Sequence, residues 1–358
     1  MMRRSRNLLV VVLSLFLVLG LSNWSLAQDY PAMKLKAASW IPAGSFTNAM
    51  LEWFVEDIEK KTGGKVTFDK YWGGALYGGV ESLESLQHGV ADFCMIPPSY
   101  TPGKLPLGYS HYAFPFAPRK AAVMVSIMGQ LYQEFPWMHD ELKAHGIKVL
   151  YMGTVSDYGI LSREPIKRLD DLKNKKLVQL GGYFADWTQA AGIVPVSGIS
   201  SSDRYERLRT GVVEGSLLTP SFFVDYKEYE VAKHCVMVGL GARVPMFMSI
   251  NQKTWEKMTP DLQKLFMEVG LDVQKRHAQA TDEKLEKDLK VLQEKGVTYY
   301  GYLPEEDLTK WGAAVPDTAA KMCKSLEQKF PDIWKMADRL IELSEKAGHK
   351  WPRKFAVK

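Results

Sequence analysis

The sequence predicts an α/β fold of two lobes with a cleft between them and one long helix that spans both lobes. Three observations lead to this prediction. The chain has 358 residues, which at about 150 residues per domain allows two domains. Strands and helices alternate in two separate series, and an unbroken helical pattern follows the second series. The composition, 46% apolar and 24% charged, excludes a disordered chain.

The first series runs strand, helix, strand, helix, strand. Its first helix places Met50, Phe54 and Ile58 on one face and stops at Gly63-Gly64, as an amphipathic helix does. Such units form parallel sheets, and ligands bind beyond the carboxyl ends of the strands. The expected elements are strands at 34–40, 65–71 and 92–96 and helices at 47–61 and 80–88.

The second series begins with a strand near residues 148–152, after which we expect the first crossing between the lobes at residues 153–158. Its apolar residues again alternate between strand and helix periods. The expected elements are strands near 148–152, 176–179, 193–196 and 212–218 and helices near 183–191 and 202–208.

A long helix is predicted to begin at Thr259-Pro260-Asp261, which supplies a capping hydroxyl, a proline at the first helical position and an acid in the first turn. From there only Gly270 interrupts the pattern before Gly296. A helix of about 35 residues is about 50 Å long, which is enough to cross two domains. A helical tail is expected after Pro304.

These elements divide the chain into two interleaved lobes. We expect lobe I to contain residues 28–154 and about 241–285, and lobe II to contain 155–240 and about 286–358, including the helical tail. Two α/β lobes joined by a returning chain are the architecture of periplasmic binding proteins, whose lobes close on a ligand by hinge motion.

The N-terminus, residues 1–27, has the pattern of a secretory signal peptide. Arg3, Arg4 and Arg6 precede an apolar run that ends before Ser25-Leu26-Ala27, and cleavage near Ala27 is expected. Loss of three arginines would lower the formal charge from +5 to +2. We therefore expect a periplasmic protein with no nucleic acid as partner.

Motifs of catalysis and of metal or cofactor binding are absent from the sequence. There is no G-x-S-x-G, H-E-x-x-H, C-x-x-C or G-x-x-x-x-G-K-[ST]. Gly239-Leu240-Gly241 lacks the third glycine of a dinucleotide loop and is interpreted as a turn. Three cysteines are too few for a disulfide framework, and Cys94 is expected to pack in the core. We expect a protein that is not an enzyme and uses no cofactor or metal.

Three segments, taken in order, resemble the solute-binding subunits of tripartite ATP-independent periplasmic (TRAP) transporters, the DctP-like family. They are 165–177 (PIKRLDDLKNKKL), 205–215 (YERLRTGVVEG) and 230–234 (EVAKH), and Asn251, Trp255 and the start of the long helix match the later part of the family pattern. The resemblance implies a two-lobed protein that delivers a small organic acid to the membrane subunits of a transporter.

The resemblance also implies an arginine that holds the ligand carboxylate bidentately, and here this sequence departs from the family. The clamp position carries Val178, a second arginine position falls at Tyr158, and an asparagine position falls near Leu218 or Thr219. Another donor nearby (Gln179, Arg163 or Arg204) could replace the arginine, although Gln179 should point to the opposite face of its strand from Val178. Alternatively the alignment has slipped, or the ligand has an apolar or aromatic body. We favour the last interpretation.

Aromatic residues gather where the loops after the strands should line the cleft. Rings placed there would stack on an aromatic ligand with centroids about 5 Å apart. The candidate ligand-binding residues are Trp40, Tyr71, Trp72, Tyr100, Phe114, Tyr158, Val178, Gln179, Ser201, Thr219, Phe222 and Phe223.

The predicted function is therefore capture of a small organic acid, with an aromatic or apolar body, and its delivery to the membrane subunits of a TRAP transporter. Two alternatives stay open: a binder of dicarboxylates or keto acids that uses an unidentified arginine, and a periplasmic module that presents its ligand to a histidine kinase.

Overall fold

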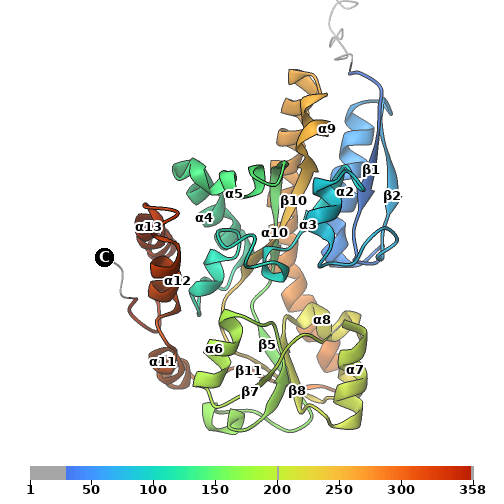
Figure 1. The fold of residues 1–358 in the computed structure, drawn as a ribbon. Helices are drawn as coiled ribbons and strands as arrows, with labels where there is room; N and C mark the ends of the chain where they lie inside the picture. Colours follow the sequence, from blue (N-terminus) through green and yellow to red (C-terminus); the bar gives the residue numbers. More distant parts are fainter. Residues whose placement is uncertain (1–29, 200, 356–358) are drawn as a thin grey trace, which may run out of the picture.

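A computed structural model describes residues 30–199 and 201–355, without the side chains of Ser201 and Ser202. The signal peptide predicted at 1–27 lies outside these residues. The described chain forms two lobes, each built on one sheet, and the long helix α10 (Pro260–Glu294) runs from one lobe into the other (Figure 1). The predicted α/β class with two lobes is confirmed.

The sheet of the first lobe combines a parallel part with an antiparallel part. β1 pairs in parallel with β2 and β3, as the first series predicts, and β10 pairs antiparallel with both β3 and β4. The helix between the first two strands, α2 (Phe46–Lys61), begins where the Ser45 hydroxyl accepts a hydrogen bond from Asn48 N. The strands in spatial order are β2 (Val66–Tyr71), β1 (Met33–Ala38), β3 (Phe93–Ile96), β10 (Arg243–Asn251) and β4 (Ile147–Val155).

The sheet of the second lobe begins where the chain first crosses between lobes. β4 ends at Val155 and β5 begins at Gly159, so the crossing falls at the place predicted. β5 pairs antiparallel with β8 and β9, whereas β6 pairs in parallel with β7 and β8. The strands in spatial order are β11 (Thr298–Tyr302), β9 (His234–Met237), β5 (Gly159–Ser162), β8 (Gly215–Leu218), β6 (Lys176–Val178) and β7 (Val194–Val196).

Helix α10 joins the cores of both lobes, as its predicted length requires. It has 35 residues, and the Thr259 hydroxyl caps it by accepting from Leu262 N. Near its start Phe266 packs in the core of the first lobe, and near its end Leu289 packs in the core of the second. The helix therefore connects the cores of the two lobes.

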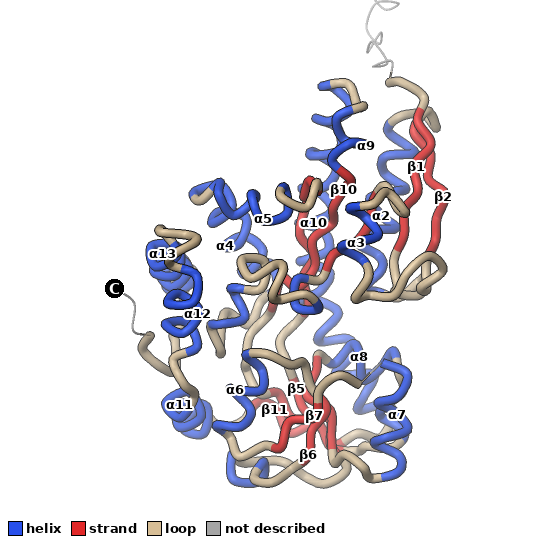
Figure 2. Tube along the Cα trace, in the orientation of Figure 1, coloured by secondary structure: helices blue, strands red, loops and turns tan. Residues whose placement is uncertain are grey.

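The remaining helices cover the two sheets and one side of the molecule (Figure 2). The C-terminal helices α12 and α13 share an apolar cluster with α4 in the first lobe. The predicted lobe limits place the whole C-terminal tail in lobe II, and those limits stay a prediction. None of the described helices is long and apolar enough to cross a membrane. The helix bounds are α3 (Ser82–Gln87), α4 (Ala121–Glu134), α5 (Asp140–Lys143), α6 (Tyr183–Ala190), α7 (Ser201–Thr210), α8 (Pro220–Asp225), α9 (Gln252–Glu256), α11 (Glu305–Ala314), α12 (Thr318–Leu326) and α13 (Ile333–Lys346).

Candidate functional site

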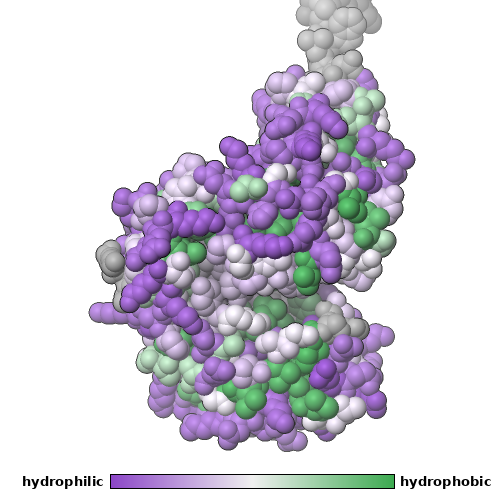
Figure 3. Space-filling view, viewed as in Figure 1, coloured by the Kyte–Doolittle hydropathy of each residue, from purple (hydrophilic) through white to green (hydrophobic). Residues whose placement is uncertain are grey.

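The surface is notched between the two lobes (Figure 3), and a pocket of about 450 Å³ lies in this cleft. Its walls come from segments that follow strands of both sheets, the place where α/β lobes bind ligands. The lining residues are Val80, Ser99, Tyr100, Tyr109, Val178, Gln179, Leu180, Gly181, Gly198, Ile199, Arg204 and Leu218.

The wall from the first lobe is an aromatic and apolar surface around Tyr100. This residue ends the 3-10 helix Pro98–Tyr100, which follows β3, and its ring lies 5.8 Å from that of Trp40. Gly79 packs below both rings, because a Cβ atom there would approach the Tyr100 ring to 2.6 Å. Val80 and Tyr100 are 57% and 42% exposed, so this wall leaves apolar surface uncovered beside the pocket.

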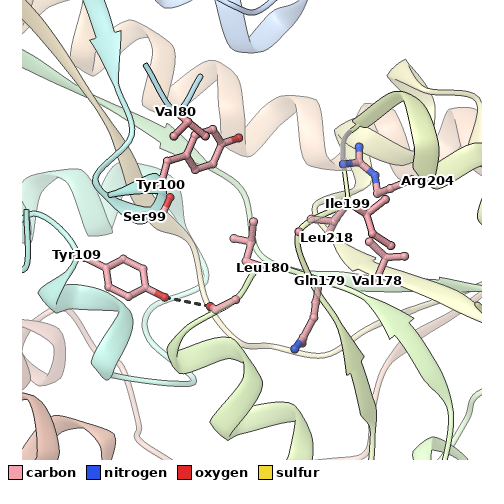
Figure 4. Close-up of a pocket in the computed structure, with 12 residues that line it drawn as sticks. Val80, Ser99, Tyr100, Tyr109, Val178, Gln179, Leu180, Ile199, Arg204 and Leu218 are labelled. Carbon is pink, nitrogen blue, oxygen red and sulfur yellow. Dashed lines mark hydrogen bonds between the residues drawn. The ribbon is translucent and has the colours of Figure 1, made fainter. Parts of the chain in front are cut away.

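The wall from the second lobe follows the end of β6. Val178, Ile199 and Leu218 lie together near Arg204, and Leu180 lies between them and Tyr109 (Figure 4). The Tyr109 hydroxyl donates a 3.2 Å hydrogen bond to Gly181 O. This bond ties the loop that carries Tyr109 to the second lobe at the edge of the pocket.

Arg204, on α7, brings the only cation among the described lining residues. Its Nε donates a 2.9 Å hydrogen bond to Glu228, which is fully buried. The guanidinium also lies 4.9 Å from the centroid of the Tyr226 ring and 5.3 Å from that of Phe222. Burial raises the pKa of Glu228, and the positive charge of Arg204 opposes that shift.

Three predicted site residues, Tyr100, Val178 and Gln179, line this pocket. The Trp40 ring packs against that of Tyr100 but is not among the lining residues. Phe222 lines a neighbouring cavity of about 280 Å³, and Thr219 and Phe222 line a third, very small one beside α10. The structure thus gathers part of the predicted set around the cleft.

Other predicted residues lie in the cores of the lobes and do not line the pocket. Phe114 and Phe223 are fully buried among apolar side chains, and Tyr158 packs its ring 4.8 Å from that of Phe184. Tyr71 and Trp72 are half-buried against the core of the first lobe. Ser201 begins α7, but its side chain lies outside the described part.

Val178 and Gln179 point in opposite directions, as the alternation of a strand requires. Val178 packs with Leu208 and Val213 beneath α7. The Gln179 side chain points away from Tyr100 and Arg204 (Figure 4), and both of its amide atoms are buried without a hydrogen-bond partner among the described residues. Of the three candidate replacements for the missing clamp, Gln179 and Arg204 line the pocket and Arg163 does not.

Sequence analysis missed Val80, Tyr109, Leu180 and Ile199 as lining residues. Leu180 lies two residues after the end of β6, so its place after a strand was a usable signal. The other three come from loops whose approach to the cleft depends on tertiary packing, and no local pattern marks them.

The two crossings between the lobes meet at Asp157. Its Oδ1 accepts 2.7 Å hydrogen bonds from Tyr158 N, on the first crossing, and from Gly241 N, on the second. Burial raises the pKa of this carboxyl group. This carboxyl group therefore ties the two crossings to each other.

The described residues contain no cluster of metal-ligating groups and no paired cysteine. No group of three His, Cys, Asp or Glu residues in that part of the chain could hold a metal ion. The three cysteines are buried and unpaired, and burial raises the pKa of Cys94 and Cys235 to about 12. The thiols are therefore unreactive, and Cys94 packs in the core as predicted.

Comparison with known proteins identifies relatives over most of the chain. The model of the family described as bacterial extracellular solute-binding protein, family 7, matches residues 37–326. A solute-binding protein of Sulfitobacter sp. (strain NAS-14.1) is 30% identical over 246 residues, which cover 66% of this chain and 71% of that relative.

Two solved structures have the same fold. A TRAP periplasmic solute-binding protein from Desulfovibrio salexigens superposes with a TM-score of 0.78 at 22% identity, covering 88% of this chain and 96% of that one. A marine metagenome TRAP solute-binding protein specific for aromatic acid ligands, solved with 3-hydroxybenzoate, superposes with a TM-score of 0.78 at 21% identity, covering 88% and 99%.

Proposed function

Because the chain belongs to the bacterial extracellular solute-binding proteins of family 7, we propose that its cleft captures a monocarboxylate with an aromatic or apolar body. Closure of the lobes on this ligand would then present it to the membrane subunits of a TRAP transporter. The N-terminal pattern supports export of the chain to the periplasm and cleavage of its signal peptide near Ala27. The protein would bind and release the ligand without converting it chemically.

The observation that carries the proposal is that Arg204 is the one cation among the described lining residues, most of which are apolar or tyrosyl. A guanidinium has five N–H donors, so Arg204 can donate to a ligand carboxylate while its Nε donates to Glu228. Glu228 offsets part of the positive charge, and the positions at which the family resemblance implies a clamp arginine and a second arginine carry Val178 and Tyr158. The pocket thus offers charge for one carboxylate and not for two, because an unpaired buried carboxylate costs several kcal/mol.

The walls also favour a ring as the body of the ligand. The half-exposed ring of Tyr100 presents an aromatic surface, and Val80, Leu180 and Ile199 add apolar surface around the pocket. Aromatic pairs add about 0.5–1.5 kcal/mol beyond the apolar area that they bury. The metagenome protein with 3-hydroxybenzoate supports this class, since the same fold accommodates an aromatic acid.

Mass spectrometry of small molecules that co-purify with the protein tests the proposal. We expect a monocarboxylate with an aromatic or branched apolar body. A thermal-shift panel of benzoate, phenylacetate, succinate and pyruvate complements it, because a ligand at 100 times its Kd adds about 2.7 kcal/mol of stability. Stabilisation by succinate alone would contradict the proposal.

A further inference from the structure

Glu141, on the short helix α5, is a buried carboxylate outside the pocket that holds the backbone of a pocket loop. Its Oε1 accepts a 2.7 Å hydrogen bond from Leu107 N, and its Oε2 accepts a 3.0 Å bond from Gly108 N. The residue is only 7% exposed. Both oxygens thus bind the two amide groups directly before Tyr109, which lines the pocket.

The loop that starts at these amides is tightly packed. A Cβ atom at Gly108 would lie 2.7 Å from both the Phe247 ring and Pro98, so the backbone sits directly against lobe I. At the other end of the loop, Arg243 Nη2 donates to Phe114 O at 3.1 Å, and the Thr318 hydroxyl donates to Ala113 O at 2.6 Å. Tyr109 is therefore carried by a segment anchored on both sides.

Tyr109 connects this loop to the second lobe by direct contacts. Its hydroxyl donates to Gly181 O, and its ring stacks on that of Tyr183 with centroids 5.2 Å apart. The fit leaves little tolerance, because a Cβ atom at Gly182 would lie 2.5 Å from the Tyr109 hydroxyl. The position of the loop therefore determines the contact between the lobes at the edge of the pocket.

We propose that Glu141 is a positioning residue for ligand binding: its carboxylate holds the Leu107 and Gly108 amides and so sets Tyr109 against Gly181 and the ligand. The inference rests on the proposed function of the pocket. Only a group with two acceptor oxygens serves this purpose, because a glutamine would turn its NH₂ group toward one of the two amide N–H donors.

The charge of Glu141 also predicts a pH profile. Burial raises the pKa of Glu141 to about 7, against the effect of the two amide donors. The charged and titratable groups that interact with it are Lys329, which lowers its pKa, and the phenol of Tyr132 on α4. Deprotonation as the pH rises through about 7 therefore strengthens the hold of this carboxylate on the loop, and protonation of one oxygen as the pH falls weakens it.

Hydrogen exchange of the ligand-free protein tests this inference without any ligand. Glu141→Gln should increase exchange several-fold in residues 105–112 and also in residues 180–183 of the second lobe. Glu134→Gln is the matched control, because Glu134 is exposed at the end of the neighbouring helix α4, where it pairs with Arg339. This control variant should change the exchange of neither segment. Unchanged exchange in 105–112 or in 180–183 would overturn the inference.

Titration with benzoate as the probe completes the test. Glu141→Gln should weaken benzoate binding about tenfold and flatten its dependence on pH between 6 and 8, whereas Glu141→Asp should retain that dependence. Wild-type affinity together with the wild-type pH profile in Glu141→Gln would refute the positioning role. If benzoate binds no variant, including the wild type, the proposed ligand class fails, and the exchange experiment alone decides the role of Glu141.

Discussion

Replacing the buried pair of Arg204 and Glu228 separates its contribution to folding from its contribution to binding. Arg204→Met alone leaves the fully buried Glu228 carboxylate without its guanidinium, and breaking such a pair costs about 3–5 kcal/mol of unfolding free energy. Adding Glu228→Gln removes the stranded charge. The double variant should therefore recover most of that loss, to within about 1 kcal/mol of the wild type.

Binding should respond differently, because the ligand carboxylate loses its guanidinium in both variants. A hydrogen bond to a charged group contributes about 1.5–3 kcal/mol, so we expect the Kd for benzoate to rise roughly 10- to 150-fold in the double variant despite its recovered stability. Denaturant unfolding gives the stability, and isothermal titration calorimetry gives the Kd. Wild-type affinity in the stable double variant would refute the role of Arg204, and wild-type stability of Arg204→Met would refute the buried pair.

Three further predictions concern the fold around the site. Val178→Arg places a guanidinium among the apolar side chains beneath α7. It should lower the unfolding free energy by about 3 kcal/mol or more and weaken benzoate binding. Unchanged stability and affinity would show that residue 178 faces solvent. Gly241→Ala brings a Cβ atom against Ala117 O at a backbone φ of +94°, so thermal unfolding should occur several degrees lower, and an unchanged Tm would contradict the tight packing of the second crossing. Burial lowers the pKa of His277 to about 4, so the unfolded state binds more protons than the folded state between pH 6.5 and pH 4. The unfolding free energy should therefore fall as the pH drops from 6.5 toward 4, by up to about 1.4 kcal/mol per pH unit. Denaturant unfolding across that range should show a smaller fall for His277→Gln.

The sequence predicted those parts of the fold that have a clear period and clear ends. α10 could be predicted because Thr259 and Pro260 mark its start and Gly296 lies just beyond its end. β10 was missed because all of its nine residues are buried, so it shows no alternation, and because its antiparallel pairing depends on a segment far away in the sequence.

The site could be predicted only where its residues follow strands. Tyr100 ends the short 3-10 helix that follows β3, and Val178 is the last residue of β6. The chain order alone therefore places both near the cleft. Phe114 and Phe223 have the same aromatic character but fill the cores, because residue type does not distinguish a pocket wall from an interior. Ile199 reaches the pocket through the way in which the lobes pack, which no local pattern encodes.

Calorimetric titration of the mature protein with benzoate and with succinate tests the central claim most directly. Both are small acids, but only benzoate combines one carboxylate with an aromatic ring, as the single guanidinium of Arg204 and the wall around Tyr100 require. We predict saturable binding of benzoate and no detectable binding of succinate under the same conditions. Tighter binding of succinate than of benzoate would contradict the claim.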